Sequence, residues 1–284
     1  MASRGTESLG GSQSTQTNVV LPNTMQWTMV SKRGRSYRIM AAIPTQECLP
    51  PGYPILYVLD GNSVFGTAVE ALRLQCRLPE KTGVVPSVII GIGYEVDEPF
   101  SSERFYDLTP EPTREFLYRF AEGAVPEQGG ADEFADFLEE ELKPLIERNW
   151  RIDRTRQSLL GHSLGGLFVA HLLFTRPGSF RYYIAGSPSL HWNKERMLDE
   201  ERSFVSRLAK GKIAQQLEVL ITMGELEASH PSGNYELARK LAERLILLEQ
   251  HGGRVHFLAF EEEGHVSVLP SFISRALRFA CAPE

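Results

Sequence analysis

The chain alternates short apolar stretches with longer segments in which apolar residues recur every three or four positions. The short stretches predict buried strands, and the longer segments predict amphipathic helices. The predicted strands cover residues 26–31, 37–43, 55–59, 84–92, 158–160, 182–185, 217–222 and 255–260. The predicted helices cover residues 64–77, 132–149, 164–175, 194–210, 234–251 and 266–280. This alternation predicts an α/β fold whose mostly parallel sheet is covered by helices on both faces.

Two stretches fall outside the regular alternation. Residues 1–17 are rich in Ser, Gly, Thr and Gln and predict a disordered tail, because this composition cannot bury a core. Residues 93–130 are rich in Glu, Pro and aromatic residues, and a connection of this length is typical of a lid or binding loop. Within the helix predicted over residues 132–149, Pro144 is expected to kink the helix or to end its first segment. No repeat or linker divides the remainder, so we expect a single domain over residues 18–284.

Composition and charge narrow the function only slightly. Hydrophobic residues make up 42% of the chain and the net charge is −6, which gives no support for nucleic-acid binding. No apolar run approaches the roughly 20 residues that cross a bilayer, and the N-terminus lacks the apolar core of a signal peptide. We therefore expect a cytoplasmic protein, or a periplasmic one whose signal was removed before this numbering begins. Cys48, Cys76 and Cys281 show neither metal-type spacing nor a disulfide framework.

One short motif carries the strongest chemical signal. An apolar strand leads into Gly161-His162-Ser163-Leu164-Gly165, and a helix follows at once. The glycines allow strand and helix to approach closely, which leaves the Ser163 hydroxyl exposed at the helix N-terminus, as in a nucleophile elbow. His162 is expected to point away from the nucleophile. A plain glycine-rich turn with a solvated serine is the alternative interpretation.

A serine nucleophile needs a base and a group that orients the base. In this fold the order along the chain is serine, acid, histidine. His265, between the last predicted strand and the last helix, lies where the base should be, whereas His171 is expected to be packed in the helix after the elbow. Glu227 and Glu225 both follow the strand predicted over residues 217–222, with Glu227 preferred as the acid. A serine attack also needs oxyanion donors, for which the backbone N–H groups of Leu164 and Asn62 are the candidates.

These motifs together resemble the esterase-D-like branch of the α/β-hydrolase fold, over almost all of residues 30–280. The matching motifs are Tyr57-Val58-Leu59-Asp60-Gly61-Asn62, Arg104-Phe105-Tyr106-Asp107-Leu108-Thr109-Pro110, Gly161-His162-Ser163-Leu164-Gly165-Gly166, Ser187-Pro188-Ser189-Leu190 and Gly224-Glu225-Leu226-Glu227. Within this branch the chain is most similar to bacterial esterases that cleave the trilactone backbone of the catecholate siderophores enterobactin, salmochelin and bacillibactin. The resemblance supports Glu227 as the acid and Asn62 as an oxyanion donor, although some members work with a serine–histidine pair.

The resemblance also implies a substrate and its contacts. An iron-loaded triscatecholate is an anion with flat rings, which suits arginine and aromatic side chains near the nucleophile. Arg104, His191 and Trp192 are the candidates for substrate binding, with an ion pair between Arg104 and a carboxylate such as Asp107, and packing of Trp192, as the alternatives. The implied reaction uses no metal or organic cofactor, and any iron arrives with the substrate. Other expected possibilities are an esterase or thioesterase for small acyl or feruloyl groups, an acyltransferase, and a non-catalytic siderophore-binding protein.

Overall fold

The computed structural model describes residues 17–48, 50–113, 125–213 and 216–283. At the centre of this described part lies an eight-stranded sheet. The spatial order is β1-β2-β4-β3-β5-β6-β7-β8. The pairs β1–β2 and β2–β4 are antiparallel, and all the other pairs are parallel. The strands are β1 (Thr24–Val30), β2 (Ser36–Ala42), β3 (Tyr53–Val58), β4 (Val88–Gly93), β5 (Ile152–His162), β6 (Tyr182–Gly186), β7 (Glu218–Gly224) and β8 (Arg254–Phe260). The predicted mostly parallel sheet is confirmed.

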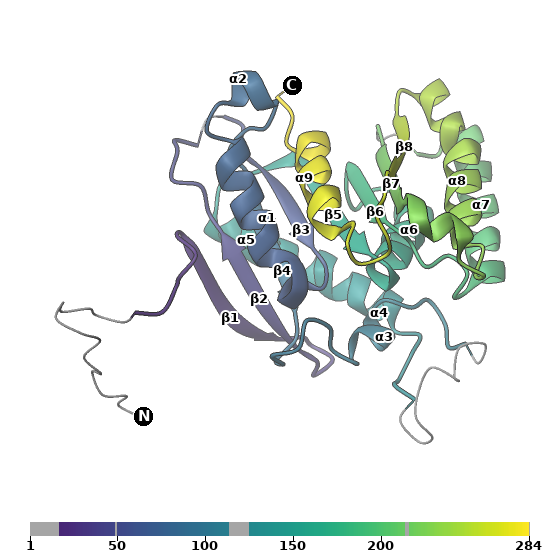
Figure 1. Cartoon of the computed structure of the whole chain (residues 1–284), viewed down its shortest axis with the longest axis horizontal. Coiled ribbons are helices and arrows are strands. Elements are labelled where there is room, and N and C mark those ends of the chain that lie inside the picture. Colours follow the sequence, from purple (N-terminus) through teal and green to yellow (C-terminus); the bar gives the residue numbers. More distant parts are fainter. Residues whose placement is uncertain (1–16, 49, 114–124, 214–215, 284) are drawn as a thin grey trace.

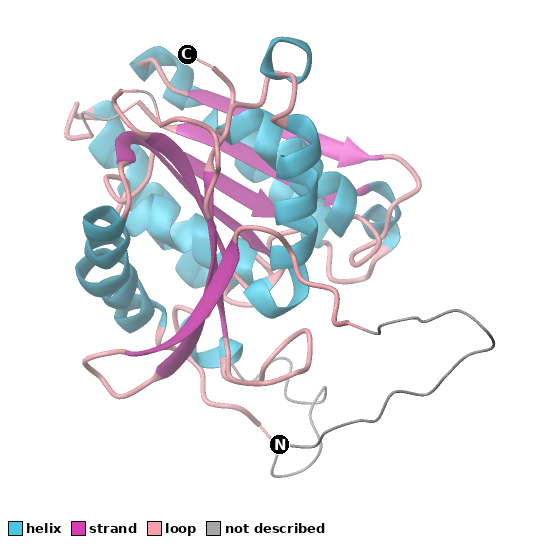
Figure 2. Ribbon diagram, turned by 90° about the vertical axis from the view of Figure 1, so that its left-hand side faces the viewer, coloured by secondary structure: helices cyan, strands magenta, loops and turns pink. Residues whose placement is uncertain are grey.

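Helices cover both faces of the sheet (Figures 1 and 2). Alternate residues of β3 point to opposite faces, so Ile55 and Tyr57 join one hydrophobic cluster while Leu56 and Val58 join another. The second cluster contains the apolar faces of α1 (Gly61–Gln75) and α9 (Leu269–Ala280). The first contains those of α4 (Ala131–Asp136), η2 (Phe137–Leu142), α5 (Lys143–Asn149), α6 (Leu164–Thr175), α7 (Lys194–Ala209) and α8 (Asn234–Leu245). Shorter helices are α2 (Pro79–Thr82), α3 (Arg104–Asp107), η3 (Glu225–Ser229) and η4 (Ile246–His251).

Two prolines explain two of the differences between the observed and the predicted elements. The strand predicted over residues 84–92 begins only at Val88, because Pro86 has no N–H for the sheet. The helix predicted over residues 132–149 consists of α4, η2 and α5. Its π-helical segment η2 ends at Leu142, immediately before the turn that contains Pro144, and the backbone stays helical on both sides. Pro144 therefore ends a first segment, as predicted, without breaking the chain of helices.

The loops that carry the predicted functional residues lie together at the carboxyl ends of the parallel strands. The segments after β3, β5, β7 and β8 all leave from the carboxyl ends of parallel strands, and such ends lie together. These segments carry the candidates at positions 62, 163, 227 and 265. Of the irregular stretch 93–130, residues 104–107 form α3 and residues 114–124 lie outside the described residues, as do residues 1–16 of the predicted tail.

Candidate active site

Ser163 occupies a sharp turn between β5 and α6. Its φ and ψ are 60° and −116°, a conformation that costs energy for a residue with a side chain and is typical of functional turns. A Cβ atom on Gly161 would collide with the backbone of Gly165, so the close approach of strand and helix requires glycine here. The Ser163 backbone N–H donates to the Gly186 carbonyl at 2.9 Å and ties the turn to β6. This is the geometry of a nucleophile elbow.

Three side chains that are far apart in the sequence form one hydrogen-bonded chain at this turn. His265 Nε2 lies 3.0 Å from Ser163 Oγ, and His265 Nδ1 lies 2.7 Å from Glu227 Oε2. Because an ionised carboxylate only accepts hydrogen bonds, Nδ1 carries the proton that is donated to Glu227, and Nε2 accepts the proton of the Ser163 hydroxyl. The His265 side chain is 43% exposed, so it can exchange protons with solvent. The arrangement is that of a serine nucleophile, a base and an orienting acid.

Glu227 reaches His265 from η3, directly after β7. Its Oε1 accepts hydrogen bonds from the Ser187 hydroxyl at 2.6 Å and from the Gly224 backbone N–H at 2.9 Å. Burial alone would raise the pKa of the Glu227 carboxyl, but the hydrogen bonds from His265, Ser187 and Gly224 outweigh burial and hold that pKa below its usual range. Glu227 is therefore ionised at neutral pH and can fix the orientation of the imidazole.

Glu225, the alternative acid, makes a different contact. Its Oε2 accepts the backbone N–H of Glu262 at 3.0 Å, and the adjacent Leu226 N–H donates to the Glu263 carbonyl at 3.0 Å. Both bonds fasten η3 to the loop that carries His265. The structure thus separates the two carboxylates that the sequence left as alternatives, since one contacts the imidazole and the other holds its loop.

The segment after β3 lies against the elbow. Asp60 has a φ of 52°, and α1 begins with the next residue. A Cβ atom on Gly165 would lie 3.4 Å from Asp60 Oδ2, so the beginnings of α1 and α6 lie close together. Asn62 and Leu164 belong to these first turns, where backbone N–H groups have no partner within the helix. Such N–H groups are suited to bind an oxyanion.

Arg104 was a candidate for substrate binding, but the structure places its guanidinium in an ion pair with a carboxylate. Its Nε and Nη2 donate to Oδ1 and Oδ2 of Asp60, each at 2.7 Å, and the side chain is 8% exposed. It does not line the cavity beside Ser163. The guanidinium is committed to a buried bidentate pair, which braces the segment that carries Asn62. The pairing partner is therefore Asp60 and not Asp107, whose carboxylate accepts two tyrosine hydroxyls and whose pKa burial raises to about 7.

Two adjoining cavities open at the elbow. The first, of about 280 Å³, is lined by Ser163 and His265, and the second, of about 510 Å³, shares His191 and Ser232 with it. His191 therefore lies at the junction of the two cavities. Trp192 lines the second cavity but is only 4% exposed, because its ring packs against Phe105 with centroids 5.7 Å apart. Of the two candidates, His191 lies nearer the elbow cavity and Trp192 forms the wall of the neighbouring one.

Three side chains beside the hydrogen-bonded chain received no role from the sequence, which only expected His162 to point away from the nucleophile. His162 is buried with its ring centroid 4.7 Å from that of His265, and burial together with His265 lowers the pKa of His162 to about 3. Ser187 holds Glu227, and Ser189 Oγ lies 3.2 Å from Ser163 Oγ. The motif Ser187-Pro188-Ser189-Leu190 marked this loop in the sequence, but nothing in it assigned partners to the hydroxyls. His162 packs on the base while its backbone belongs to the elbow.

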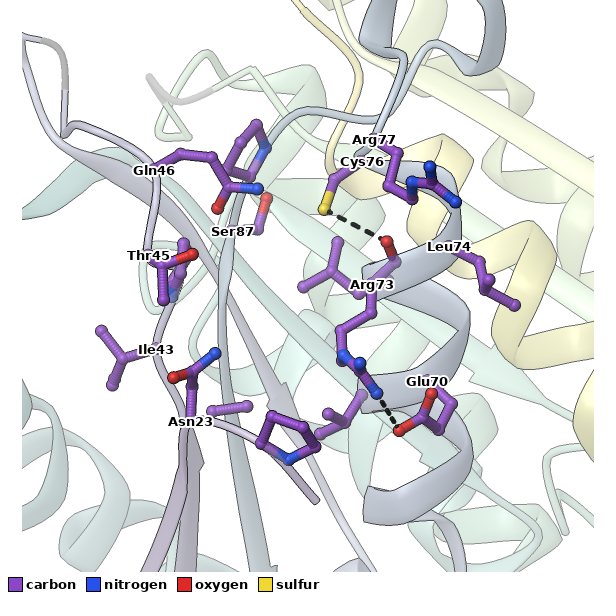
Figure 3. Close-up of a pocket in the computed structure, with 16 residues that line it drawn as sticks. Asn23, Ile43, Thr45, Gln46, Glu70, Arg73, Leu74, Cys76, Arg77 and Ser87 are labelled. Atoms are coloured by element: carbon purple, nitrogen blue, oxygen red, sulfur yellow. Dashed lines mark hydrogen bonds and ion pairs between the residues drawn. The ribbon is translucent and has the colours of Figure 1, made fainter. Parts of the chain in front are cut away.

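A further cavity, of about 500 Å³, lies at the opposite end of the strands, and Figure 3 shows the residues that line it. It is bounded by the C-terminal half of α1 and the segment after β2, and its lining includes Arg73, Cys76 and Gln46. Because β2 runs antiparallel to β4, this segment lies where the parallel strands begin, whereas Ser163 follows the end of β5. This cavity is therefore separate from the candidate active site.

Across residues 17–48, 50–113, 125–213 and 216–283, no three His, Cys, Asp or Glu side chains are grouped so as to hold a metal ion. The helices of that part of the chain include none with both the length and the apolar character that a membrane crossing requires.

The sheet, the elbow and the Ser163–His265–Glu227 arrangement define a class of protein, the serine hydrolases of the α/β-hydrolase fold. Residues 32–259 match the family model described as "Putative esterase", and the chain belongs to this esterase family.

Comparison with known proteins shows which members of this family are similar to the chain. The chain is 50% identical over 266 residues to the ferri-bacillibactin esterase BesA of Bacillus subtilis (strain 168), with 93% of this chain and 91% of the relative covered. It is 34% identical over 286 residues to the siderophore triacetylfusarinine C esterase of Aspergillus fumigatus, with 92% and 94% covered. The solved structure of the BES protein from Bacillus cereus aligns with a TM-score of 0.86 at 40% identity, covering 94% of this chain and 99% of that chain. The resemblance to siderophore esterases that the motifs predicted is confirmed.

Proposed function

We propose that this protein hydrolyses the ester bonds of a siderophore trilactone through a serine acyl-enzyme. The observation that carries the proposal is the continuous hydrogen-bonded chain from Glu227 through His265 to Ser163, next to an open cavity. The substrate class is supported by relatives that are named as esterases of bacillibactin and of triacetylfusarinine C. Among these substrates we favour a catecholate trilactone, in its ferric or iron-free form, because the bacillibactin esterase shares half of its aligned residues with this chain.

The proposed reaction has two halves. His265 Nε2 takes the proton of Ser163 as Oγ attacks the ester carbonyl, and Glu227 stabilises the imidazolium that forms. The backbone N–H groups of Asn62 and Leu164 donate to the oxyanion. The alcohol leaves with the proton from His265, and water that the same imidazole deprotonates then hydrolyses the acyl-enzyme. Each cycle consumes one water and one ester bond and yields one acid and one alcohol.

The two adjoining cavities support a substrate with several arms. The reacting ester would lie in the cavity at Ser163, and a second arm would pass His191 into the larger cavity beside Trp192. We propose that these two side chains contact the flat rings of the substrate. Arg104 acts instead behind the oxyanion segment, through Asp60. Iron, where present, is part of the substrate, and the acyl-transfer steps use only side chains, backbone and water.

We also propose a cytoplasmic setting, with the periplasm as the alternative. Cys76 and Cys281 are thiols, which suits a reducing compartment. The net charge of −6 is compatible with a small-molecule substrate and does not favour nucleic acid.

The test is mass spectrometry of products from ferric and iron-free bacillibactin, enterobactin and salmochelin, with triacetylfusarinine C and p-nitrophenyl acetate as comparison substrates. We expect linear fragments from at least one catecholate trilactone, and Ser163→Ala should lose several orders of magnitude in rate. Hydrolysis of p-nitrophenyl acetate alone would remove the siderophore assignment and leave a serine esterase. New esters formed with an added acceptor alcohol would indicate an acyltransferase. Near-normal turnover by Ser163→Ala would overturn the mechanism.

A further inference from the structure

The hydroxyl of Ser189 touches the oxygen that the proposed mechanism makes reactive. Ser189 Oγ lies 3.2 Å from Ser163 Oγ, and Ser189 lines the cavity at the elbow. The residue is only 6% exposed, so its hydroxyl is not freely solvated. None of the proposed steps uses this group.

The direction of this hydrogen bond follows from the neighbouring imidazole. His265 Nδ1 donates its proton to Glu227, so Nε2 has a lone pair and accepts from the Ser163 hydroxyl. The Ser163 hydroxyl has only one proton to give, and its remaining lone pairs can only accept. In the resting enzyme Ser189 is therefore the donor and Ser163 Oγ is the acceptor.

The loop that carries Ser189 is fixed from both sides. The Ser189 backbone N–H donates to the Ser163 carbonyl at 3.0 Å, and Asn234 Nδ2 donates to the Pro188 carbonyl at 2.7 Å. Ser187, in the same loop, has a φ of 41° and donates its hydroxyl to Glu227. One short loop thus places two hydroxyls on the two ends of the hydrogen-bonded chain, one on the acid and one on the nucleophile.

We propose that Ser189 speeds the second half of the reaction by donating to Ser163 Oγ as this oxygen leaves the acyl group. The inference rests on the proposed function, because it requires Ser163 to carry the acyl group. Water adds to the acyl carbon and gives a proton to His265. The C–Oγ bond then breaks, its electron pair goes to Oγ, and His265 returns the proton that restores the Ser163 hydroxyl. Ser189 keeps its own proton throughout.

The two halves of the reaction differ in what this hydrogen bond contributes. In the resting enzyme the bond is already present before the attack, so it changes the barrier to acylation little. In the acyl-enzyme Oγ is an ester oxygen, which is a weak acceptor. The bond from Ser189 strengthens only as negative charge returns to Oγ, and a contact that strengthens in the transition state lowers the barrier. Ser189 therefore acts mainly on deacylation.

Ser189→Ala tests this role by removing the donor without a change in charge. Rapid mixing with a p-nitrophenyl ester, followed by quenching and intact-protein mass spectrometry, measures the formation and the decay of the acyl-enzyme separately. We expect decay to slow about tenfold, the effect of one lost hydrogen bond, and formation to change by less than about twofold. The acyl-enzyme then accumulates, and kcat and KM fall together. Ser189→Thr keeps a hydroxyl and should restore most of the decay rate.

Ser187→Ala is the matched control, since it removes the other hydroxyl of the same loop. It should slow formation and decay alike, because Glu227 and His265 serve both halves. If the acyl-enzyme of Ser189→Ala decays at the wild-type rate, or if formation and decay slow equally, the assigned role is wrong and the proposed function stands. An acyl adduct on Ser163→Ala would instead overturn the proposed function. Circular dichroism checks folding, and Ser189→Cys, a weaker donor of similar size, gives the same comparison should the alanine variant not fold.

Discussion

Two histidine–carboxylate pairs lie along helix α6, one beside its N-terminus and one in its middle. His265 Nδ1 lies 2.7 Å from Glu227, and His171 Nδ1 lies 2.8 Å from Glu200. By this contact alone the two pairs are equivalent, and each carboxylate could orient an imidazole.

The second ring nitrogen separates the two pairs. His265 Nε2 faces the Ser163 hydroxyl, and the side chain is partly exposed. His171 Nε2 faces a second carboxylate, Asp132, at 3.5 Å, and its side chain is fully buried. Burial lowers the pKa of His171, but Asp132 and Glu200 outweigh burial and raise that pKa above its ordinary value.

The difference shows what turns such a pair into a catalytic base. A histidine between one carboxylate and one hydroxyl can take a proton and return it, whereas two carboxylates favour the charged form of a histidine that lies between them. The pair at His265 should therefore govern rate and the pair at His171 should govern stability.

Replacement of the base should have the largest effect. We expect His265→Gln to lower kcat about 10⁴- to 10⁶-fold, because Ser163 loses its proton acceptor, with the free energy of unfolding changed by less than about 1 kcal/mol at this partly exposed position. Steady-state kinetics on the preferred ester and urea unfolding measure the two quantities. His171→Gln is the control, and it should keep most of the wild-type kcat while the protein is folded. An equal loss of kcat in both variants would remove the distinction between the pairs.

Replacement of the orienting acid should follow in size. Glu227→Gln is expected to lower kcat about 10³- to 10⁴-fold, because an amide no longer stabilises the imidazolium or selects the Nδ1–H tautomer. Glu225→Gln makes the same change two residues away, at a carboxylate that holds the loop of His265 through the backbone of Glu262. This variant should lower kcat less than about tenfold. Comparison of kcat for the two variants is the measurement. If Glu227→Gln retains near-normal kcat, the site works as a serine–histidine pair.

The sequence predicted the sheet and the order of the chemistry because both depend on local features. Apolar periodicity placed the strands and helices, and the glycines around Ser163 identified the turn. Chain order alone then pointed to His265, since each loop leaves the carboxyl end of a parallel strand. The sequence also predicted that His171 is packed, and its side chain is fully buried.

The sequence could not predict partners that are brought together only by the tertiary fold. Arg104 pairs with Asp60 across 44 positions, and Ser189 meets Ser163 across 26. No periodicity or motif links residues at these separations. The sequence also does not show whether an arginine is buried in an ion pair or faces a substrate. For this reason the sequence did not identify Asp60 as the partner of Arg104, and the hydroxyl of Ser189 went unassigned.

Loss of the buried pair should lower stability more than rate. His171→Gln leaves the carboxylate of Glu200 buried without its contact to the imidazole, although Arg196 Nε still donates to it at 2.6 Å. We expect the free energy of unfolding to fall by about 2–3 kcal/mol, somewhat below the usual cost of breaking a buried pair because Arg196 remains. Urea unfolding at neutral pH measures the change. The double variant His171→Leu, Glu200→Met removes both charges and should recover part of the loss, and no recovery would mean that packing, not charge, sets the cost.

The smallest expected effect is the pH dependence of this same stability. The folded protein raises the pKa of His171 above the ordinary value of about 6.5, so the folded state binds the proton more tightly than the unfolded state. The stabilisation is fully present below that ordinary value and is lost as the pH rises through the raised value. Between about pH 6 and about pH 9, the free energy of unfolding of the wild type should therefore fall more than that of His171→Gln. Groups other than His171 titrate in both proteins, so the difference between the two urea-unfolding series isolates this imidazole. Parallel curves would mean that folding leaves the pKa of His171 unchanged, and the contrast with His265 would then depend on solvent access alone.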